Sequence, residues 1–180
     1  ILNEMKCDMV SSDELYPLWQ EANRNNWWLR NAAGQRVQWN TVYGACDLNI
    51  TGWGTRNAAG QTYAQYKWQF DRSALFGVAP FDFMFIDNTF GTTRAAADWQ
   101  RVGADMPKGD ATASAAMRLG YVAYWNAVRA TDPELKLVGN ADNDLSSSEY
   151  KGGLDGAFLE GALGKSWSRE TWAGWDSMMN

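Results

Sequence analysis

Short apolar segments alternate with amphipathic helical patterns along this chain, and the alternation limits the folds open to it. Extended, largely apolar segments are predicted at residues 1–10, 43–51, 81–86, 135–139 and 154–159. Helical periodicity lies between several of them, from a capping segment at 11–14 to residue 22, at 63–76 and at 113–130. Elements in this order are typical of an α/β fold with a parallel sheet.

The length of the chain decides how much of such a fold it can build. We count roughly four or five strand–helix units, whereas a closed eight-stranded barrel takes about 200 residues or more. The chain has 180 residues. We therefore expect a single domain over 1–180: a (β/α) TIM-type barrel, present as an incomplete barrel or fragment truncated at both ends. A missing segment or self-association would complete the barrel.

Two local patterns add detail to this prediction. The helix at 63–76 is expected to bury Tyr66 and Phe70, with Lys67 and Asp71 outside. The hexapeptide RNAAGQ occurs twice, at 30–35 and at 56–61. A single recurrence does not make a repeat architecture, so we expect one Asn/Gly turn chemistry to be used twice.

Composition excludes several classes of function. Histidine is absent, which removes Ser-His and Cys-His relays and the usual zinc ligands, so acid/base chemistry falls mainly to carboxylates. The net charge is −5 and the basic residues are scattered, which argues against nucleic acid as a partner. No apolar run reaches the roughly 18 residues that a membrane span needs.

Cys7 and Cys46 form no CxxC motif. A disulfide in an exported protein and two buried free thiols both fit this spacing, and the sequence leaves the two alternatives open.

Tryptophan is unusually frequent, with 11 residues in the chain. About half of them are expected in the core, and the remainder could line a groove, because an indole face suits a pyranose ring. The candidates for stacking platforms are those in predicted loops, namely Trp27, Trp28, Trp39, Trp53 and Trp167.

Polar residues follow the predicted strands, where parallel α/β folds place their functional groups. Asp87 ends the strand at 81–86, and Glu160 ends the strand at 154–159. Asp87 could instead be a loop cap, and Glu160 could be a salt-bridge partner or an exposed strand-end residue. Glutamate is a poor turn former, however, so nothing local explains Glu160.

Two carboxylates on one face of a barrel could cleave a glycosidic bond, one as acid and the other as nucleophile or base. We assign these catalytic roles to Asp87 and Glu160. Asn88 and Asn140 are expected to bind sugar hydroxyls or to orient a carboxylate. Glu4, Lys6 and Asp8 alternate along the first strand, so they could face the substrate, or they could form a structural ion-pair network.

Several motifs together resemble a known family. They are NEMK at 3–6, WWLR at 27–30, DLNIT at 47–51, FIDN at 85–88, VGN at 138–140 and GAFLE at 156–160. They are similar to segments of the hypothetical glycoside hydrolases of bacteria, which are secreted (β/α)-barrel enzymes. The resemblance implies a barrel, a secreted or periplasmic location and cleavage of a polysaccharide or oligosaccharide without a cofactor. It also places Asp87 and Glu160 at the acidic strand-end positions.

Two other functions remain open. The chain could be a non-catalytic carbohydrate-binding module, or an inactive glycosidase relative, with an aromatic sugar groove and structural acids. It could also be another barrel enzyme, with a Ca²⁺ or Mg²⁺ site built from Asp142, Asn143 and Asp144, although these residues more closely match a polar turn.

Overall fold

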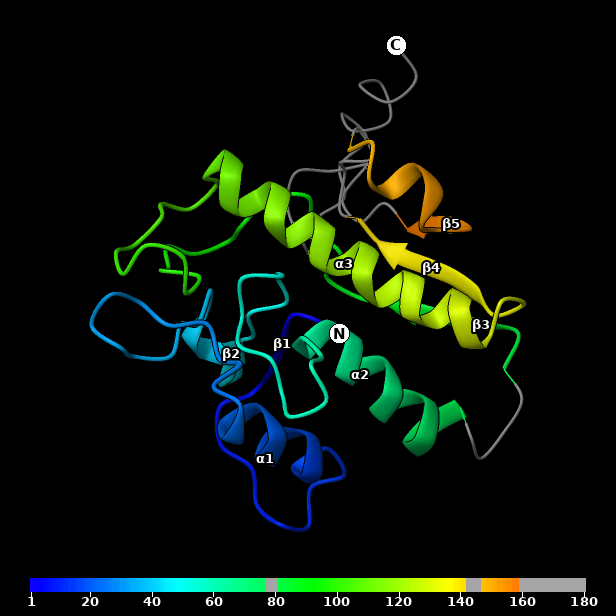
Figure 1. Ribbon diagram of the computed structural model, residues 1–180, viewed down its shortest axis with the longest axis horizontal. Helices are drawn as coiled ribbons and strands as arrows, with labels where there is room; N and C mark the ends of the chain where they lie inside the picture. Colours follow the sequence, from blue (N-terminus) through cyan, green and yellow to red (C-terminus); the bar gives the residue numbers. More distant parts are fainter. Residues whose placement is uncertain (77–80, 142–146, 159–180) are drawn as a thin grey trace.

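The structure is a computed structural model in which residues 1–76, 81–141 and 147–158 are described. The strands and α-helices follow one another as β1 (Glu4–Lys6), α1 (Tyr16–Arg24), β2 (Ala45–Asp47), α2 (Tyr63–Asp71), β3 (Phe83–Ile86), α3 (Ala111–Thr131), β4 (Lys136–Asn140) and β5 (Gly156–Phe158) (Figure 1). Shorter helical turns lie at Thr41–Tyr43, Arg72–Phe76 and Tyr150–Gly152.

The strands form two separate small sheets. β1 and β2 pair antiparallel, with Glu4 directly opposite Asp47. β3, β4 and β5 form a parallel sheet in that order. α3 crosses this second sheet, and its Tyr124 hydroxyl contacts the Met84 sulfur of β3 at 3.5 Å (Figure 1). The parallel sheet therefore has its helix on one face and places the ends of β3 and β4 side by side.

The prediction of a (β/α) TIM-type barrel is wrong, because the described residues form no closed or partial barrel of that kind. β1 pairs antiparallel with β2, so neither strand joins the parallel sheet, which has three strands within the described part of the chain. Its face opposite α3 leaves Phe83, Phe85 and Phe158 about half exposed, where the inside of a barrel would bury them.

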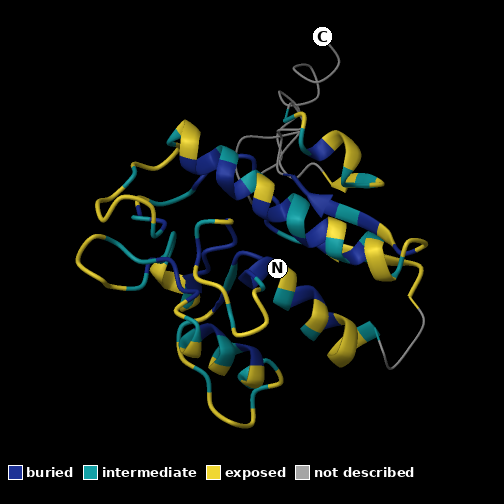
Figure 2. Cartoon of the chain, viewed as in Figure 1, coloured by how far each residue is buried: buried dark blue, intermediate teal, exposed yellow. Residues whose placement is uncertain are grey.

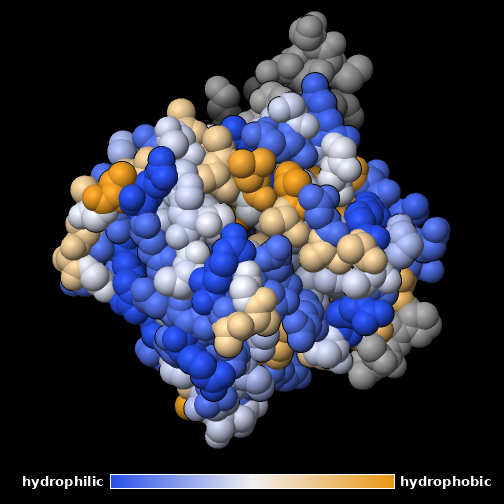
Figure 3. All heavy atoms as spheres, in the orientation of Figure 1, coloured by the Kyte–Doolittle hydropathy of each residue, from blue (hydrophilic) through white to orange (hydrophobic). Residues whose placement is uncertain are grey.

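Aromatic residues dominate the core. Trp27, Trp28 and Trp125 are fully buried, together with Tyr63 and Tyr121. The buried residues of α3 form a continuous stripe along the helix (Figure 2). On the opposite side of α3, apolar side chains gather on a face that is otherwise largely hydrophilic, and Leu119 is among the exposed ones (Figure 3). Core packing thus accounts for much of the tryptophan content.

Two charged residues of α2 are buried, although they were predicted to be exposed. Lys67 and Asp71 were expected outside, but both are buried, and they form an ion pair with each other. The Tyr124 hydroxyl of α3 donates a hydrogen bond of 2.7 Å to the second oxygen of Asp71. The pair can be buried because each charge has a partner one helical turn away and α3 supplies a further donor.

The two RNAAGQ segments adopt the same turn, as predicted. In each copy the asparagine N–H donates to the glutamine carbonyl at 3.0 Å, and the glutamine N–H donates to the asparagine side chain at 2.9 Å. Gly34 and Gly60 occupy equivalent positions, with φ of 78° and 77°. The arginine of each copy closes the turn by donating to the glycine carbonyl.

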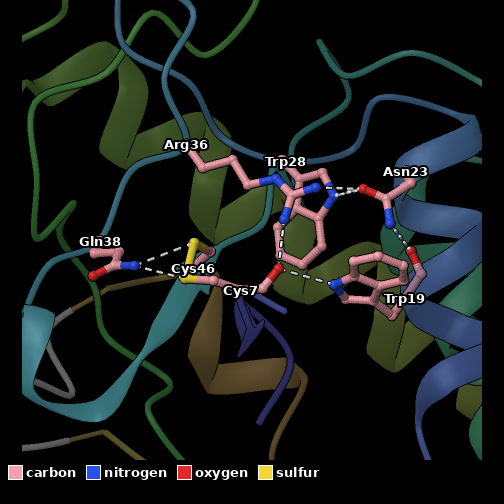
Figure 4. The surroundings of a disulfide bond; sticks show 7 residues. All are labelled: Cys7, Trp19, Asn23, Trp28, Arg36, Gln38 and Cys46. Atoms are coloured by element: carbon pink, nitrogen blue, oxygen red, sulfur yellow. Dashed lines mark hydrogen bonds between the residues drawn. A yellow bond between two sulfur atoms is a disulfide. The ribbon is translucent and has the colours of Figure 1, made fainter. Parts of the chain in front are cut away.

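A disulfide joins Cys7, which follows β1, to Cys46 of β2, with the two Cα atoms 4.8 Å apart. This resolves the alternative that the sequence left open. Figure 4 shows that Arg36 and Trp19 both donate to the Cys7 carbonyl, at 2.5 and 3.0 Å. The guanidinium of Arg36 also lies 4.2 Å from the centre of the Trp28 ring. The crosslink therefore ties the antiparallel pair to α1 and to the core.

Candidate functional site

Asp87 and Asn140 meet where β3 and β4 end. The parallel register sets Ile86 opposite Gly139, so the next residue of each strand falls side by side. The Asn140 side-chain amide donates to Asp87 Oδ1 at 2.9 Å. The backbone N–H of Asn88 donates to the same oxygen, also at 2.9 Å. Two predicted site residues are thus in direct contact, and Asp87 is held in one orientation while remaining half-buried.

Asn88 links Asp87 to a second carboxylate. Its backbone has φ of 57°, in the left-handed region that asparagine tolerates better than most residues. The Tyr121 hydroxyl of α3 donates to the Asn88 carbonyl at 2.7 Å, which fixes this conformation. The Asn88 side-chain amide then donates to Glu4 Oε1. Asn88 therefore bridges the carboxylates of Asp87 and Glu4.

Glu4 lies at the centre of the polar network, and its side chain is only 7% exposed. Trp39 Nε1 donates to Glu4 Oε2 at 2.8 Å, and Arg94 Nη2 lies 3.4 Å from the same oxygen. The Arg94 guanidinium is itself enclosed between the rings of Trp39 and Phe90, at 4.4 and 4.5 Å from their centres. We call Glu4, Asp87, Asn88, Arg94 and Asn140 the Asp87 network.

Asp47 lies beside this network and is chemically different from Glu4. It is 7% exposed, and its Oδ1 accepts no hydrogen bond among the described residues. The pKa of Asp47 is raised to about 7, mainly by burial; the charge of Arg94 opposes this shift and the charge of Glu4 adds to it. Two carboxyl groups opposite each other thus occupy contrasting environments: Glu4 is paired with a cation, and Asp47 favours its protonated form up to neutral pH.

The remaining predicted polar residues lie apart from Asp87. Lys6 is exposed and forms an ion pair with Asp13 at 3.2 Å. Asp8 is also exposed. Within the described part of the chain, neither contacts the Asp87 network, so the first strand contributes Glu4 alone. Glu160 lies outside the described residues, as do Asp142, Asn143 and Asp144.

The predicted tryptophan platforms fall into different surroundings. Trp39 touches the network, as its bond to Glu4 shows. Trp28 and Trp27 are fully buried in the core and leave no ring face open to a sugar. Trp53 is half-buried, with the Arg101 guanidinium 5.1 Å from its ring centre. Trp167 lies outside the described residues.

Sequence reasoning did not find Arg94 or Asp47. Arg94 lies in the segment 89–113, where no period is visible, and its role depends on Trp39 and Glu4, which are more than 50 residues away along the chain. Asp47 carries one usable signal: it is a lone carboxylate inside the predicted strand at 43–51, with Cys46 and Leu48 on either side.

Within the described ranges, no group of three or more Cys, Asp or Glu side chains is arranged to hold a metal ion. No helix there is long and apolar enough to cross a membrane. In comparisons with known proteins, no family model, no curated sequence and no solved structure matches the chain.

Proposed function

We propose that the chain is a glycoside hydrolase that cleaves a polysaccharide or oligosaccharide with two carboxylates and no cofactor. The observation that carries the proposal is the Asp87 network. In it, a carboxylate at a strand end is oriented by Asn140 and by the Asn88 N–H. Asn88 connects it to a second carboxylate, that of Glu4, which accepts a hydrogen bond from the Trp39 ring. The resemblance of its motifs to the hypothetical bacterial glycoside hydrolases is a second argument for this proposal.

Asp87 suits the role of nucleophile or base. Its Oδ1 accepts two N–H donors, whereas its Oδ2 accepts none from the described residues. A carboxylate held through one oxygen keeps the other available for an anomeric carbon or for a water molecule. The surrounding amides fix its direction, which lowers the entropy cost of reaching a reactive geometry.

Glu160 is assigned the complementary role, as general acid. β5 runs beside β4 and β4 beside β3, so at the usual strand spacing the ends of β3 and β5 are about 10 Å apart. This spacing of the strand ends is close to the upper limit of the roughly 5–9.5 Å over which paired carboxylates flank a sugar, and Glu160 itself lies outside the described residues.

Aromatic side chains near Glu4 support a sugar as the ligand. Trp39 is half-buried, and Tyr43, which is exposed, lies 5.9 Å away between ring centres. Aromatic rings that combine an apolar face with a polar edge are suited to stacking on pyranoses. The Cys7–Cys46 disulfide supports a secreted or periplasmic location, because such bonds persist in oxidising compartments.

The test is hydrolysis of a polysaccharide panel by the wild type and by three variants. Asp87→Asn and Glu160→Gln should each lower the rate of cleavage by about 100-fold or more. Asp8→Asn is the matched control, because Asp8 is an exposed aspartate outside the network, and it should cleave like the wild type.

Two results would reject the two-carboxylate mechanism. One is cleavage by both Asp87→Asn and Glu160→Gln at the wild-type rate. The other is a wild type that binds sugars without cleaving any of them, with binding lost in Trp39→Ala. The second result would favour a carbohydrate-binding module. The Trp39–Tyr43 ring pair is consistent with that alternative as well.

A further inference from the structure

Four buried polar atoms converge on a small cavity behind Arg94. The cavity has a volume of about 20 Å³ and lies between the β1–β2 pair and the segment that carries Arg94 and Trp99. Asn3 and Asp47 line it from the side of the sheet. Apolar residues complete its wall, among them Leu48, Ile50 and Met117.

The four atoms have no hydrogen-bond partner among the described residues. They are Asn3 Oδ1, Asp47 Oδ1, Arg94 Nη2 and Trp99 Nε1. Asn3, Asp47 and Trp99 are 8%, 7% and 4% exposed, so bulk water does not satisfy them. Arg94 Nη2 does approach Glu4 at 3.4 Å, but without hydrogen-bond geometry. Leaving such groups unsatisfied destabilises the folded state, because each loses its hydrogen bond to water without a replacement.

The chemistry of the four atoms identifies the ligand. Two of them are acceptors, on Asn3 and Asp47, and two are donors, on Arg94 and Trp99. A cation would face the guanidinium, and an anion would face the amide oxygen and the carboxyl group. Only a molecule that donates twice and accepts twice matches all four, and the volume exceeds the roughly 10–15 Å³ that a single water molecule requires.

We propose that this cavity is a binding site for one internal water molecule, held jointly by Asn3, Asp47, Arg94 and Trp99. Trp99 is positioned for this role because the Asn49 side chain donates to its carbonyl at 3.1 Å. The bound water connects the β1–β2 pair to Arg94, and Arg94 in turn lies against Glu4. The site thereby supports the Asp87 network from behind, whether or not the chain cleaves sugars.

The test is a high-resolution crystal structure of the full chain and of two matched variants. In the wild type, we expect an ordered water peak within about 3 Å of at least three of the four atoms. Trp99→Phe removes one donor and should lose the peak or lower its occupancy. Trp125→Phe is the control: Trp125 Nε1 is also buried without a partner, but it does not line the cavity.

A second measurement covers the case in which Trp99→Phe does not fold. Asn3→Leu removes an acceptor and fills part of the cavity, and oxygen-17 magnetic relaxation should then detect fewer long-lived internal waters than in the wild type. The proposal is overturned by a well-ordered wild-type map with no peak in the cavity. It is equally overturned if the four atoms pair directly with one another, or if Asn3→Leu leaves the relaxation signal unchanged.

Discussion

At the scale of single residues, the contrast between Glu4 and Asp47 is the most informative feature. Both are carboxyl groups, and they lie opposite each other on adjacent strands. Glu4 accepts from Trp39 and Asn88 and lies against Arg94, while the buried Oδ1 of Asp47 accepts no hydrogen bond from the described residues. The two groups therefore have unlike surroundings, and burial favours the neutral form of Asp47.

This contrast predicts a specific pH dependence of stability. Burial raises the pKa of Asp47 from 3.8 to about 7, so the folded state binds the proton more tightly than the unfolded state does. The Asp47 contribution to the free energy of unfolding is therefore fully present below about pH 4 and is lost as the pH rises to about 7. The loss should amount to a few kcal/mol, at about 1.4 kcal/mol per pH unit.

Asp47→Asn isolates this effect, because the amide is neutral at every pH. Urea unfolding between pH 4 and pH 8 should give the variant a flatter profile than the wild type, and greater stability above pH 7. The charged groups facing Asp47 are Glu4 and Arg94, and both are retained in the variant. Profiles that run parallel for the two proteins would show that Asp47 does not titrate in this range.

At the scale of elements, local periodicity predicted the helices and strands better than their pairing. The helix expected at 113–130 corresponds to α3, and the strands expected at 81–86, 135–139 and 154–159 overlap β3, β4 and β5. These patterns depend on neighbours a few residues away. The antiparallel pairing of β1 with β2 is set instead by contacts across about 40 residues, which periodicity does not report.

The same distinction applies to the candidate site. The contact between Asp87 and Asn140 was predictable, because parallel strands end at the same edge of a sheet. The position of Arg94 was not predictable, because it depends on contacts with Trp39, Phe90 and Glu4 that form only in the folded chain. The burial of Lys67 and Asp71 was not predicted, because it depends on the ion pair between them and on the hydrogen bond from Tyr124 of α3 to Asp71.

The repeated turn makes a prediction about glycine. Gly34 and Gly60 have positive φ, which a residue with a Cβ adopts only with strain, although nothing lies within 4 Å of an added Cβ. Gly34→Ala and Gly60→Ala should therefore each lower the free energy of unfolding by about 1 kcal/mol through backbone strain alone.

The control for this prediction is Gly52→Ala. Gly52 has equal space around it but no positive φ, so its substitution should be close to neutral in the same chemical denaturation experiment. A loss of stability in Gly52→Ala equal to that of the two turn variants would show that backbone strain is not the cause.

At the scale of the whole molecule, two small sheets take the place of a continuous barrel, and a disulfide closes the first of them. The Cys7–Cys46 bond spans 39 residues. Closing a loop of that length stabilises the folded state by about 4 kcal/mol in the chain-entropy treatment, with measured values near 2–4 kcal/mol. The crosslinked loop contains α1 and much of the tryptophan-rich core.

Replacing both cysteines by serine should therefore lower the free energy of unfolding by about 2–4 kcal/mol, measured by denaturant unfolding without reductant. Adding reductant should destabilise the wild type by a similar amount and leave the double variant unchanged. A wild type that is insensitive to reductant under unfolding conditions would contradict a stabilising role for the crosslink.

The proposed cleavage of glycosidic bonds at Asp87 is tested most directly by the steady-state kinetics of Asp87→Asn on a sugar polymer that the wild type cleaves. The substitution keeps the size of the side chain and its position beside Asn140, but it removes the carboxylate. We expect kcat to fall by about 100- to 10,000-fold while KM stays close to the wild-type value. An Asp87→Asn variant with wild-type kcat would contradict the claim that the ends of β3 and β4 form the site of glycosidic cleavage.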